Sequence, residues 1–481
     1  CLKRVHFMVN QGGVVIKSSK TLLFGFLILV FLFVCYFFSF DVSSYVDELS
    51  IAFIVLALFV YIFLSFLSLG FKPTSLTVLF FVSTAVFIFG RFFSKILNPD
   101  VDIFAIDFFA TYKLAPYDGV RLGFLSMIFL FSMYMGAVLG RDIKFKLGSS
   151  GGVEEGGGHF SPMLRMVIFF LVVIICSINL YVEYRNYVIS SSDGYLSLYS
   201  FQGEAYAGGK FFKSLFYIAL GLSYSFCLER EKKIIILSLF VMGLLSLLAG
   251  QRGGFVISLF MLLWAYGINH KVSWFGVLAA FSLFFLSLVL FGSLSARSLA
   301  VNLDSGWLGF VSKFLYDQGI SLMVFDVSTK VSDYPLVATI QNFVPGASRL
   351  ASIFYDLRMQ DVSYADYLAY HLDPVTYLGG LGLGWSLPST FYIWSFEQVF
   401  LFSAFSACFG FLLKTLDNKT LSSSFFLGLA ACLVSVIIIL PRSQFSNVIP
   451  LAIYFCVFFP VFSAFAKKSK YIMSSPVSDR G

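Results

Sequence analysis

The chain has 481 residues, of which 59% are hydrophobic, 19% aromatic and only 12% charged, and its formal net charge is +7. A soluble domain carries about 25% charged residues, so this composition excludes an ordinary soluble protein. Apolar runs of about 18–20 residues recur along the whole length, enough to cross a hydrocarbon core of about 30 Å. A membrane barrel would show short alternating strands instead, so the sequence predicts an all-α polytopic membrane protein.

Taken in chain order, the apolar runs predict about twelve membrane-spanning helices. They lie near 21–40, 51–70, 75–92, 121–140, 166–183, 212–228, 234–249, 254–269, 272–293, 388–413, 421–440 and 448–466. The polar break after the first run lacks a small-residue cleavage site, so we expect a retained helix and not a signal peptide.

The distribution of charge between the segments that join these spans predicts their orientation. An even number of spans puts both termini on one side. With the N-terminus in the cytoplasm, the inside segments hold 19 of the 33 basic residues and 7 of the 26 acidic ones. Since basic residues gather in cytoplasmic loops, both termini are predicted to be cytoplasmic. The overall basicity then reflects topology and anionic lipid, and needs no nucleic-acid partner.

The whole chain, 1–481, is predicted to form one integral membrane domain. Residues 141–165 are rich in glycine and serine, which is typical of a flexible linker, here on the cytoplasmic side. Residues 294–387 form a large external loop. Within it, apolar residues recur at three- and four-residue spacing over 345–372, which predicts amphipathic helices. Such helices lie on the membrane surface or fold over a cavity between the spans.

Three residues are candidates for acid–base chemistry. His371 is the single histidine outside the predicted cytoplasmic segments, and a neutral imidazole is a ready proton acceptor. A purely structural hydrogen-bonding role stays open for it. Asp361 is a carboxylate of the same loop. Glu397 lies within the outer part of the predicted span 388–413, where an acid faces a cavity or a partner. A direct role and an ion pair with an arginine both remain open for Glu397.

Four arginines are candidates for phosphate binding. Arg252, Arg349 and Arg442 lie at predicted external ends of spans, in GQRGG, PGASR and LPRSQF, and Arg358 lies in the large loop. Interfacial arginines commonly extend to the lipid headgroups, and this interpretation stays open. The glycines around Arg252, however, leave backbone N–H groups and a helix N-terminus accessible. A guanidinium also suits bidentate recognition of phosphate or pyrophosphate.

Several catalytic motifs are absent from the sequence. It contains no Walker-type phosphate loop, no zinc-binding spacing and no serine-hydrolase elbow. The two carboxylates of NPDVDIF (98–104) have no supporting motif. We therefore expect neither a metal nor another cofactor.

The order of these features resembles the bacterial oligosaccharide repeat-unit polymerases of the Wzy type, which polymerise O-antigen, capsule or related glycans. The resemblance rests on LLAGQRGGF (247–255), a large late loop ending in GGLGLGWSLPS, the following FYIWSFEQVFLFSAFSACFGFLL, and PRSQF (441–445) before the last span. It covers about residues 235–466. The first half is similar only as a series of helices.

The resemblance implies a glycosyl transfer at the outer surface of the bacterial inner membrane, within a GT-C-like architecture. The donor would be a growing glycan on undecaprenyl pyrophosphate, and the acceptor a single repeat unit on a second undecaprenyl pyrophosphate. Membrane lipids and a chain-length-regulating membrane protein are the further partners it implies. The arginines would stabilise the pyrophosphate leaving group, and His371 or a loop carboxylate would accept the proton of the acceptor hydroxyl.

Three alternatives remain. An O-antigen ligase uses the same donor and also combines external arginines with a loop histidine. A lipid-linked oligosaccharide flippase or secondary transporter often has twelve spans, although charges at span ends disfavour it. A polyprenyl-phosphate glycosyltransferase of the GT-C type would place acids in its first external loop, where Asp47 and Glu48 stand.

Overall fold

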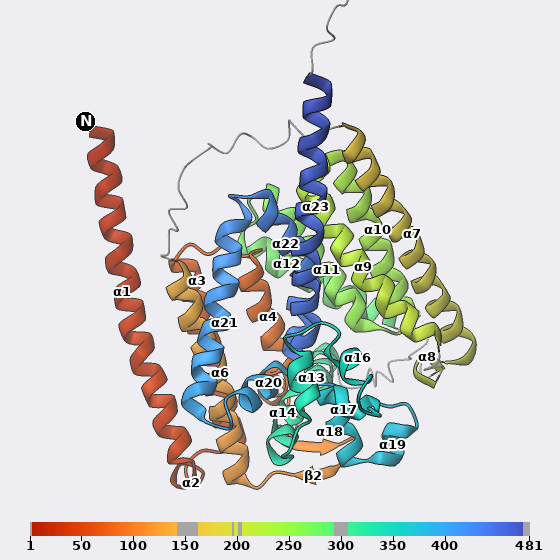
Figure 1. Ribbon diagram of the computed structural model, residues 1–481. Helices are drawn as coiled ribbons and strands as arrows, with labels where there is room; N and C mark the ends of the chain where they lie inside the picture. The colour runs from red at the N-terminus through yellow and green to blue at the C-terminus, as the bar shows by residue number, and fades with distance from the viewer. Residues whose placement is uncertain (1, 142–161, 195–196, 201–203, 293–305, 475–481) are drawn as a thin grey trace, which may run out of the picture.

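The computed structural model describes residues 2–141, 162–194, 197–200, 204–292 and 306–474. These residues are almost entirely helical, as the apolar periodicity predicts (Figure 1). The helices before the large loop are α1 (Leu2–Phe37), α2 (Ser39–Val42), α3 (Glu48–Ser68), α4 (Leu76–Phe87), α5 (Gly90–Leu97), α6 (Pro116–Arg141), α7 (Pro162–Asp193), α8 (Ser197–Ser200), α9 (Glu204–Phe226), α10 (Glu229–Leu248), α11 (Arg252–Asn269) and α12 (Trp274–Gly292).

The large loop contributes short helices, and longer ones follow it. The loop helices are α13 (Gly306–Gln318), α14 (Ser321–Lys330), α15 (Leu336–Gln341), α16 (Ala347–Ala351), α17 (Met359–Val362), α18 (Tyr364–Leu372) and α19 (Pro374–Leu378). They are followed by α20 (Leu387–Trp394), α21 (Val399–Thr420), α22 (Ser424–Ile439), the 3-10 turns η2 (Leu440–Arg442) and η3 (Phe445–Asn447), and α23 (Ile449–Ser474).

Seven helical segments of the described chain are long and apolar enough to cross a membrane. An eighth arises if α4 and α5, bent by 60° at their junction, count as one span. The all-α membrane fold is therefore confirmed, whereas twelve spans and a GT-C-like architecture stay predictions. All twelve predicted runs fall on helices, but four of them form α9 to α12, which fail the length or hydropathy requirement over their described residues.

The predicted span 388–413 is not continuous. Its first part, α20, has only eight residues, and the chain turns at Ser395 to Gln398 before α21 begins. Phe396 and Glu397 both adopt positive φ there, 51° and 64°. Two consecutive non-glycine residues in the left-handed region end a helix, which periodicity alone does not reveal. Glu397 therefore lies in an exposed turn and not inside a span.

Helix α6 is the most buried span, with 89% of its apolar window inside the protein. It packs closely on α21 because a glycine of each helix lies against the backbone of the other helix. A Cβ at Gly136 would overlap the carbonyl group of Ala407, and one at Gly410 would overlap that of Met133. Small residues at such contacts are typical of helix association in membranes. A hydrogen bond between the hydroxyl groups of Ser132 and Ser403, 2.7 Å long, joins the same two helices.

The two ends of the bundle differ. Helices α13 to α19 gather at the lower end in Figure 1 with the hairpin of β1 (Ala105–Asp107) and β2 (Thr111–Lys113), which pair antiparallel with Ala105 opposite Lys113. We call this the loop end. The start of α1, the end of α6 and the end of α23 lie at the opposite end, the linker end. The predicted linker itself falls mostly outside the described residues, as does 293–305 of the predicted loop.

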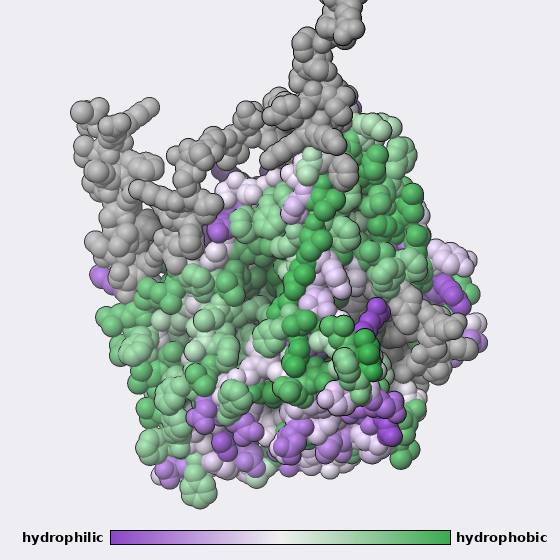
Figure 2. Space-filling model, in the orientation of Figure 1, coloured by the Kyte–Doolittle hydropathy of each residue, from purple (hydrophilic) through white to green (hydrophobic). Residues whose placement is uncertain are grey.

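The surface is consistent with a membrane environment. Figure 2 shows apolar side chains over the sides of the bundle and a hydrophilic rim along the lower edge of the loop end. Which end faces the cytoplasm stays a prediction from the charge distribution.

Candidate functional site

The segment that carries Arg442 is fastened to the large loop. Pro441 follows the end of α22, and Arg442 closes η2 with an exposed side chain. Its Nη1 donates a hydrogen bond to Oε1 of Gln318, the last residue of α13, over 3.0 Å. Two residues later, Nε2 of Gln444 donates to the hydroxyl of Ser363 at the start of α18, over 2.8 Å. The segment is thus bonded to two separate parts of the loop.

A third hydrogen bond and a ring cluster complete this attachment. The N–H of Ser446 donates to Oδ1 of the buried Asn342, over 2.9 Å. The ring of Phe445 packs against those of Phe391, Trp394 and Phe409. Arg442 is therefore held on a defined scaffold at the loop end.

The structure brings Arg358 and Asp361 into the neighbourhood of this scaffold. Arg358 precedes α17 with an exposed side chain, and its backbone N–H donates to Oδ2 of the half-buried Asp361, over 2.8 Å. Ser363, which bonds Gln444, is two residues beyond Asp361. One carboxylate oxygen of Asp361 is thus occupied in capping α17. Arg349 is exposed on α16, where the N–H of its neighbour Ser348 donates to Oε1 of Gln341 over 2.9 Å.

An exposed apolar surface lies next to Arg349 and Arg358 in the chain. Its side chains are all more than half exposed, and they are Leu350, Ile353, Phe354, Tyr355 and Met359. We call them the α16 apolar surface, and Figure 2 shows apolar atoms in this region above the hydrophilic rim. Apolar groups flanked by arginines are typical of segments that lie in a membrane interface. The arrangement suits a ligand with a phosphate group and a hydrocarbon chain.

The other two acid–base candidates are accessible to solvent. His371 is exposed near the end of α18, and its ring centroid lies 4.9 Å from that of Tyr367. Glu397 is exposed in the turn between α20 and α21. No described hydrogen bond or ion pair joins His371, Glu397 and Asp361 to one another, so the structure places these candidates separately on the loop end.

The GQRGG joint lies between α10 and α11. Gly250 has φ of 81°, which a glycine adopts freely, and α11 begins at Arg252. The side chain of Arg252 lies outside the described residues. Figure 1 places the start of α11 toward the loop end of the bundle. Val256, one turn into α11, shares a small cavity with Phe314 of α13. Helix α13 therefore lines a cavity together with the helix that begins with Arg252, and its Gln318 accepts a hydrogen bond from Arg442.

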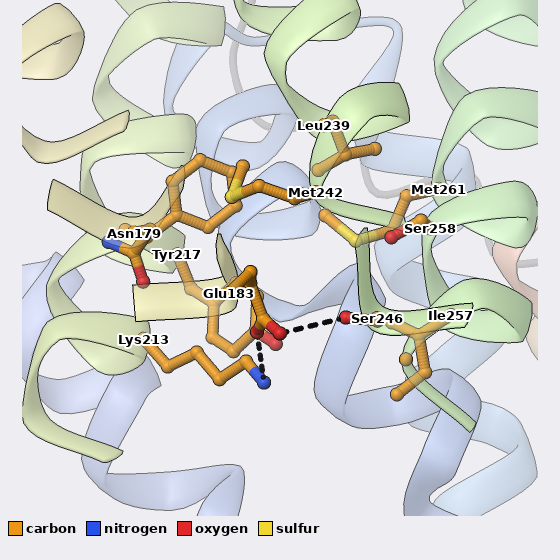
Figure 3. A pocket seen from close by; sticks show the side chains of 12 residues that line it. Asn179, Glu183, Lys213, Tyr217, Leu239, Met242, Ser246, Ile257, Ser258 and Met261 are labelled. Atoms are coloured by element: carbon orange, nitrogen blue, oxygen red, sulfur yellow. Dashed lines mark hydrogen bonds and ion pairs between the residues drawn. The ribbon is translucent and has the colours of Figure 1, made fainter. Parts of the chain in front are cut away.

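A buried carboxylate next to this joint is a residue that sequence reasoning missed. Glu183 of α7 is 3% exposed, and its Oε1 lies 2.9 Å from Nζ of Lys213 on α9 (Figure 3). The hydroxyl of Ser246, at the end of α10, donates to Oε2 over 3.0 Å. Gly254 of the joint packs on Ser246, because a Cβ there would lie 2.8 Å from its hydroxyl oxygen. An acid in the apolar run 166–183, followed by a lysine that opens the next run, is the signal that could have revealed it.

Arg91 is a second missed residue. It is 1% exposed, and its Nη1 donates to the carbonyl groups of Ile103, over 3.0 Å, and of Ala105. Its guanidinium carbon lies 4.2 Å from the ring centroid of Tyr316 on α13. Arg91 therefore holds the β1 region and α13 against α5, which is a structural role.

Asp326 of α14 holds the hairpin from the other side. It is 5% exposed and accepts hydrogen bonds from the Tyr112 hydroxyl over 2.6 Å and from Nζ of Lys330 over 2.8 Å. Burial, with the hydrogen bond to this carboxylate, raises the pKa of the Tyr112 phenol well above its ordinary value. Both hydrogen bonds engage the carboxylate in holding the fold together, so Asp326 is unsuited to act as a free base.

The acids of the first external segment are also occupied. Asp47 caps α3 by accepting from the N–H of Ser50 over 2.8 Å, and these contacts lower its pKa. Glu48 pairs with Lys95 at 3.4 Å and with Lys113 at 3.9 Å. This engagement disfavours the alternative in which the pair serves as catalytic acids.

Within the described ranges, no three His, Cys, Asp or Glu side chains come together in a way that could hold a metal ion. The expectation of metal-independent chemistry rests on the sequence and stays a prediction.

Comparison with known families gives one match. A family model described as O-antigen polysaccharide polymerase Wzy matches residues 21–472, nearly the whole chain. No curated protein matches the chain. No solved structure matches it either.

Proposed function

The chain belongs to the O-antigen polysaccharide polymerase Wzy family of membrane proteins, and we propose that it joins lipid-linked oligosaccharide repeat units at its loop end. In this proposal the loop end faces the periplasm and the linker end the cytoplasm, as the charge distribution predicts. The protein would reside in the bacterial inner membrane.

The proposed reaction uses two undecaprenyl-pyrophosphate-linked glycans. A hydroxyl oxygen at the non-reducing end of the acceptor repeat unit forms a bond to the anomeric carbon of the donor glycan. The bond from that carbon to the donor's pyrophosphate oxygen breaks, and undecaprenyl pyrophosphate leaves with the electron pair. The hydroxyl proton passes to a base, for which His371, Asp361 and Glu397 are the candidates. No external nucleotide sugar is required, since the lipid carrier is the leaving group.

The placement of Arg442 is the observation that carries the proposal. Its segment is bonded to Gln318, Ser363 and Asn342, so the guanidinium is positioned before any ligand arrives. A pre-placed cation stabilises charge that develops on a leaving group and needs no reorganisation at that moment. Groups of this kind lower the activation barrier by about 3 kcal/mol. Arg252, Arg349 and Arg358 are proposed to share the pyrophosphate contacts.

The α16 apolar surface supports a lipid-linked substrate. It exposes five apolar or aromatic side chains, of which four lie between Arg349 and Arg358 in the chain and Met359 directly follows Arg358. A prenyl chain in the outer leaflet could contact this surface while its pyrophosphate meets the arginines. Not every aromatic residue of the loop is available to a substrate. Tyr364 and Trp385 stack on each other within the protein, with ring centroids 5.3 Å apart. Those two rings form the core of the loop, and sugars would contact other residues.

The experiment that tests the proposal uses purified protein in lipid with undecaprenyl-pyrophosphate-linked repeat units as the sole substrate. We expect a ladder of products that falls at least about 100-fold in rate in Arg442→Ala, in line with the loss of one charge-stabilising group. Arg230→Ala, which alters an exposed arginine at the linker end, is the matched control and should retain the ladder. An undiminished ladder in Arg442→Ala would reject the role of this arginine. Absence of any ladder with the wild-type protein would reject polymerisation, and the ligase alternative predicts that result because no lipid A-core acceptor is present.

The base is identified by a second set of variants. His371→Ala, Asp361→Asn and Glu397→Gln are compared for kcat at saturating donor over a range of pH. The variant of the true base loses most of kcat together with the acidic limb of the pH profile. Unchanged kcat in His371→Ala assigns the role to one of the carboxylates.

A further inference from the structure

A cleft at the linker end contains a cation that the proposed reaction does not use. Its volume is about 260 Å³, enough for several water molecules or a small anion. The α3–α4 turn, the end of α11 and the end of α21 form its walls, with Lys72, Thr74, Trp264, Lys414 and Asp417 among the lining residues. The cleft is therefore at the opposite end of the bundle from Arg442 (Figure 1).

Lys414 is the central feature of the cleft. It is only 9% exposed, although its side chain ends in an amine, a group that is ordinarily exposed to water. In the part of the chain that the structure describes, it makes no ion pair or hydrogen bond, and its Nζ lies 4.4 Å from the ring centroid of Phe71. A lysine at a membrane surface ordinarily extends to water. Here the side chain is instead enclosed and lines the cleft.

The nearest carboxylate in the chain is already engaged. Asp417, three residues beyond Lys414, accepts from the backbone N–H groups of Leu76 and Thr77, each over 2.9 Å, and from the Thr77 hydroxyl. Both of its oxygens thus bind the N-terminus of α4, where a negative charge is favourable. Asp417 fixes the wall of the cleft and leaves Lys414 without a directly bonded counter-charge.

Two more cations stand close to Lys414. Lys72 lines the same cleft, and the charges of Lys72 and Arg141 both act on Lys414. The end of α6 packs directly on the lysine, because a Cβ at Gly140 would lie 3.2 Å from the Lys414 Cβ. Nη1 of Arg141 is buried and has no hydrogen-bond partner among the described residues. Three cations against one engaged carboxylate leave a net charge of about +2 around the cleft.

We propose that this cleft binds a phosphate group, with Lys414 as the buried cation and Lys72 as the second contact. An unpaired ammonium removed from water is unfavourable, and an anion in the cleft restores its counter-charge. The cleft lies at the ends of α11 and α21, where the headgroups of a membrane crossed by these helices would lie. The phosphate can belong to an anionic membrane lipid or to a soluble compound, and the chemistry of the contact is the same.

The test measures the thermal unfolding midpoint of the detergent-purified full chain by tryptophan fluorescence. Three additives are compared: phosphatidylglycerol, inorganic phosphate, and diacylglycerol, which lacks the phosphate. A ligand that binds the folded state raises the midpoint once its concentration exceeds the dissociation constant, and the rise then grows with the logarithm of the ligand concentration. For the wild-type protein we expect a rise that grows with the logarithm of the concentration of phosphatidylglycerol, of inorganic phosphate, or of both, and none with diacylglycerol. A rise with the lipid alone identifies a headgroup site, and a rise with inorganic phosphate identifies a site for the free anion.

The variants decide whether Lys414 is responsible. Lys414→Met should require at least about 10-fold more ligand to reach the same rise in midpoint, which corresponds to about 1.4 kcal/mol of binding free energy. Lys414→Arg keeps the charge and should retain the response. Lys233→Met changes an exposed lysine at the same end and serves as the control. Should Lys414→Met not purify as a single species, Lys72→Met provides the same comparison. A wild-type response that is absent, equal for diacylglycerol, or unchanged in both Lys414→Met and Lys72→Met overturns the proposal.

Discussion

Arg442 and Gln318 are joined by a 3.0 Å hydrogen bond although 124 positions separate them in the chain. The bond links the turn after α22 to the end of α13 and fixes where the guanidinium stands. A hydrogen bond to a charged group contributes about 1.5–3 kcal/mol when it is well shielded. Because Arg442 is exposed, we expect Gln318→Ala to lower the polymerisation rate by only about 10-fold, near the lower limit of that range. Initial rates of ladder formation test this, with Gln398→Ala, an exposed glutamine of the same end, as the control.

The opposite result would contradict this prediction. A Gln318→Ala protein that polymerises at the wild-type rate would show that the position of Arg442 does not depend on Gln318.

The Glu183–Lys213 pair predicts a stability effect that a second substitution reverses. Lys213→Met leaves a carboxylate that is 4% exposed without its cation, and the Ser246 hydroxyl alone does not neutralise it. Breaking a fully buried pair costs about 3–5 kcal/mol, and the half-exposed Lys213 reduces the expected loss to about 2 kcal/mol. Glu183→Gln in the Lys213→Met background should recover most of that loss. Unfolding midpoints of the single and double variants measure it, and a double variant less stable than Lys213→Met would contradict the pairing.

Neighbouring glycines of the GQRGG joint should differ in their tolerance of a side chain. A Cβ at Gly254 would meet Ser246, whereas nothing lies within 4 Å of one at Gly253. Gly254→Val forces α10 and α11 apart and disturbs the Ser246–Glu183 contact, with an expected cost of about 1–3 kcal/mol. Gly253→Ala should be close to neutral in unfolding midpoint. Equal midpoints for the two variants would mean that the close packing at Gly254 is absent.

Tyr112 predicts a pH dependence at the alkaline end. Burial and the bond to Asp326 raise its pKa above the ordinary value of 10.0. A group whose pKa is raised in the folded state contributes its stability fully below the unfolded pKa, and this contribution is lost as pH rises through the folded pKa. The advantage in unfolding midpoint of the wild type over Tyr112→Phe should therefore be constant up to about pH 10 and decrease above it. An advantage that declines between pH 7 and 9 would indicate that another group is responsible.

The class of the protein follows from local properties of the sequence. Apolar runs long enough to cross a membrane lead to helices in any arrangement, because backbone polar groups must be satisfied within each segment. The family resemblance likewise rests on short motifs and their order along the chain, and the match over residues 21–472 agrees with it. Both are readable from neighbouring residues.

The contacts at the functional end are not local. The bonds from the Arg442 segment to Gln318, Ser363 and Asn342 each span 81 residues or more. Glu397 shows what a local pattern misses. Hydropathy predicted that it lies within a span, whereas two residues with positive φ end the helix there. Hydropathy reports the preference of a residue for lipid and does not reveal the backbone turn between α20 and α21.

The sequence by itself thus determined a helical membrane protein of the polymerase family and the arginines to consider. Only the tertiary structure decided that α13 shares a cavity with α11 and bonds Arg442 through Gln318, that Glu183 is buried beneath the GQRGG joint, and that Lys414 is enclosed in a cleft at the far end. The physical reason is that burial and pairing of a charge depend on which helices pack together. That packing arises from contacts between residues far apart in the chain, which no local pattern records.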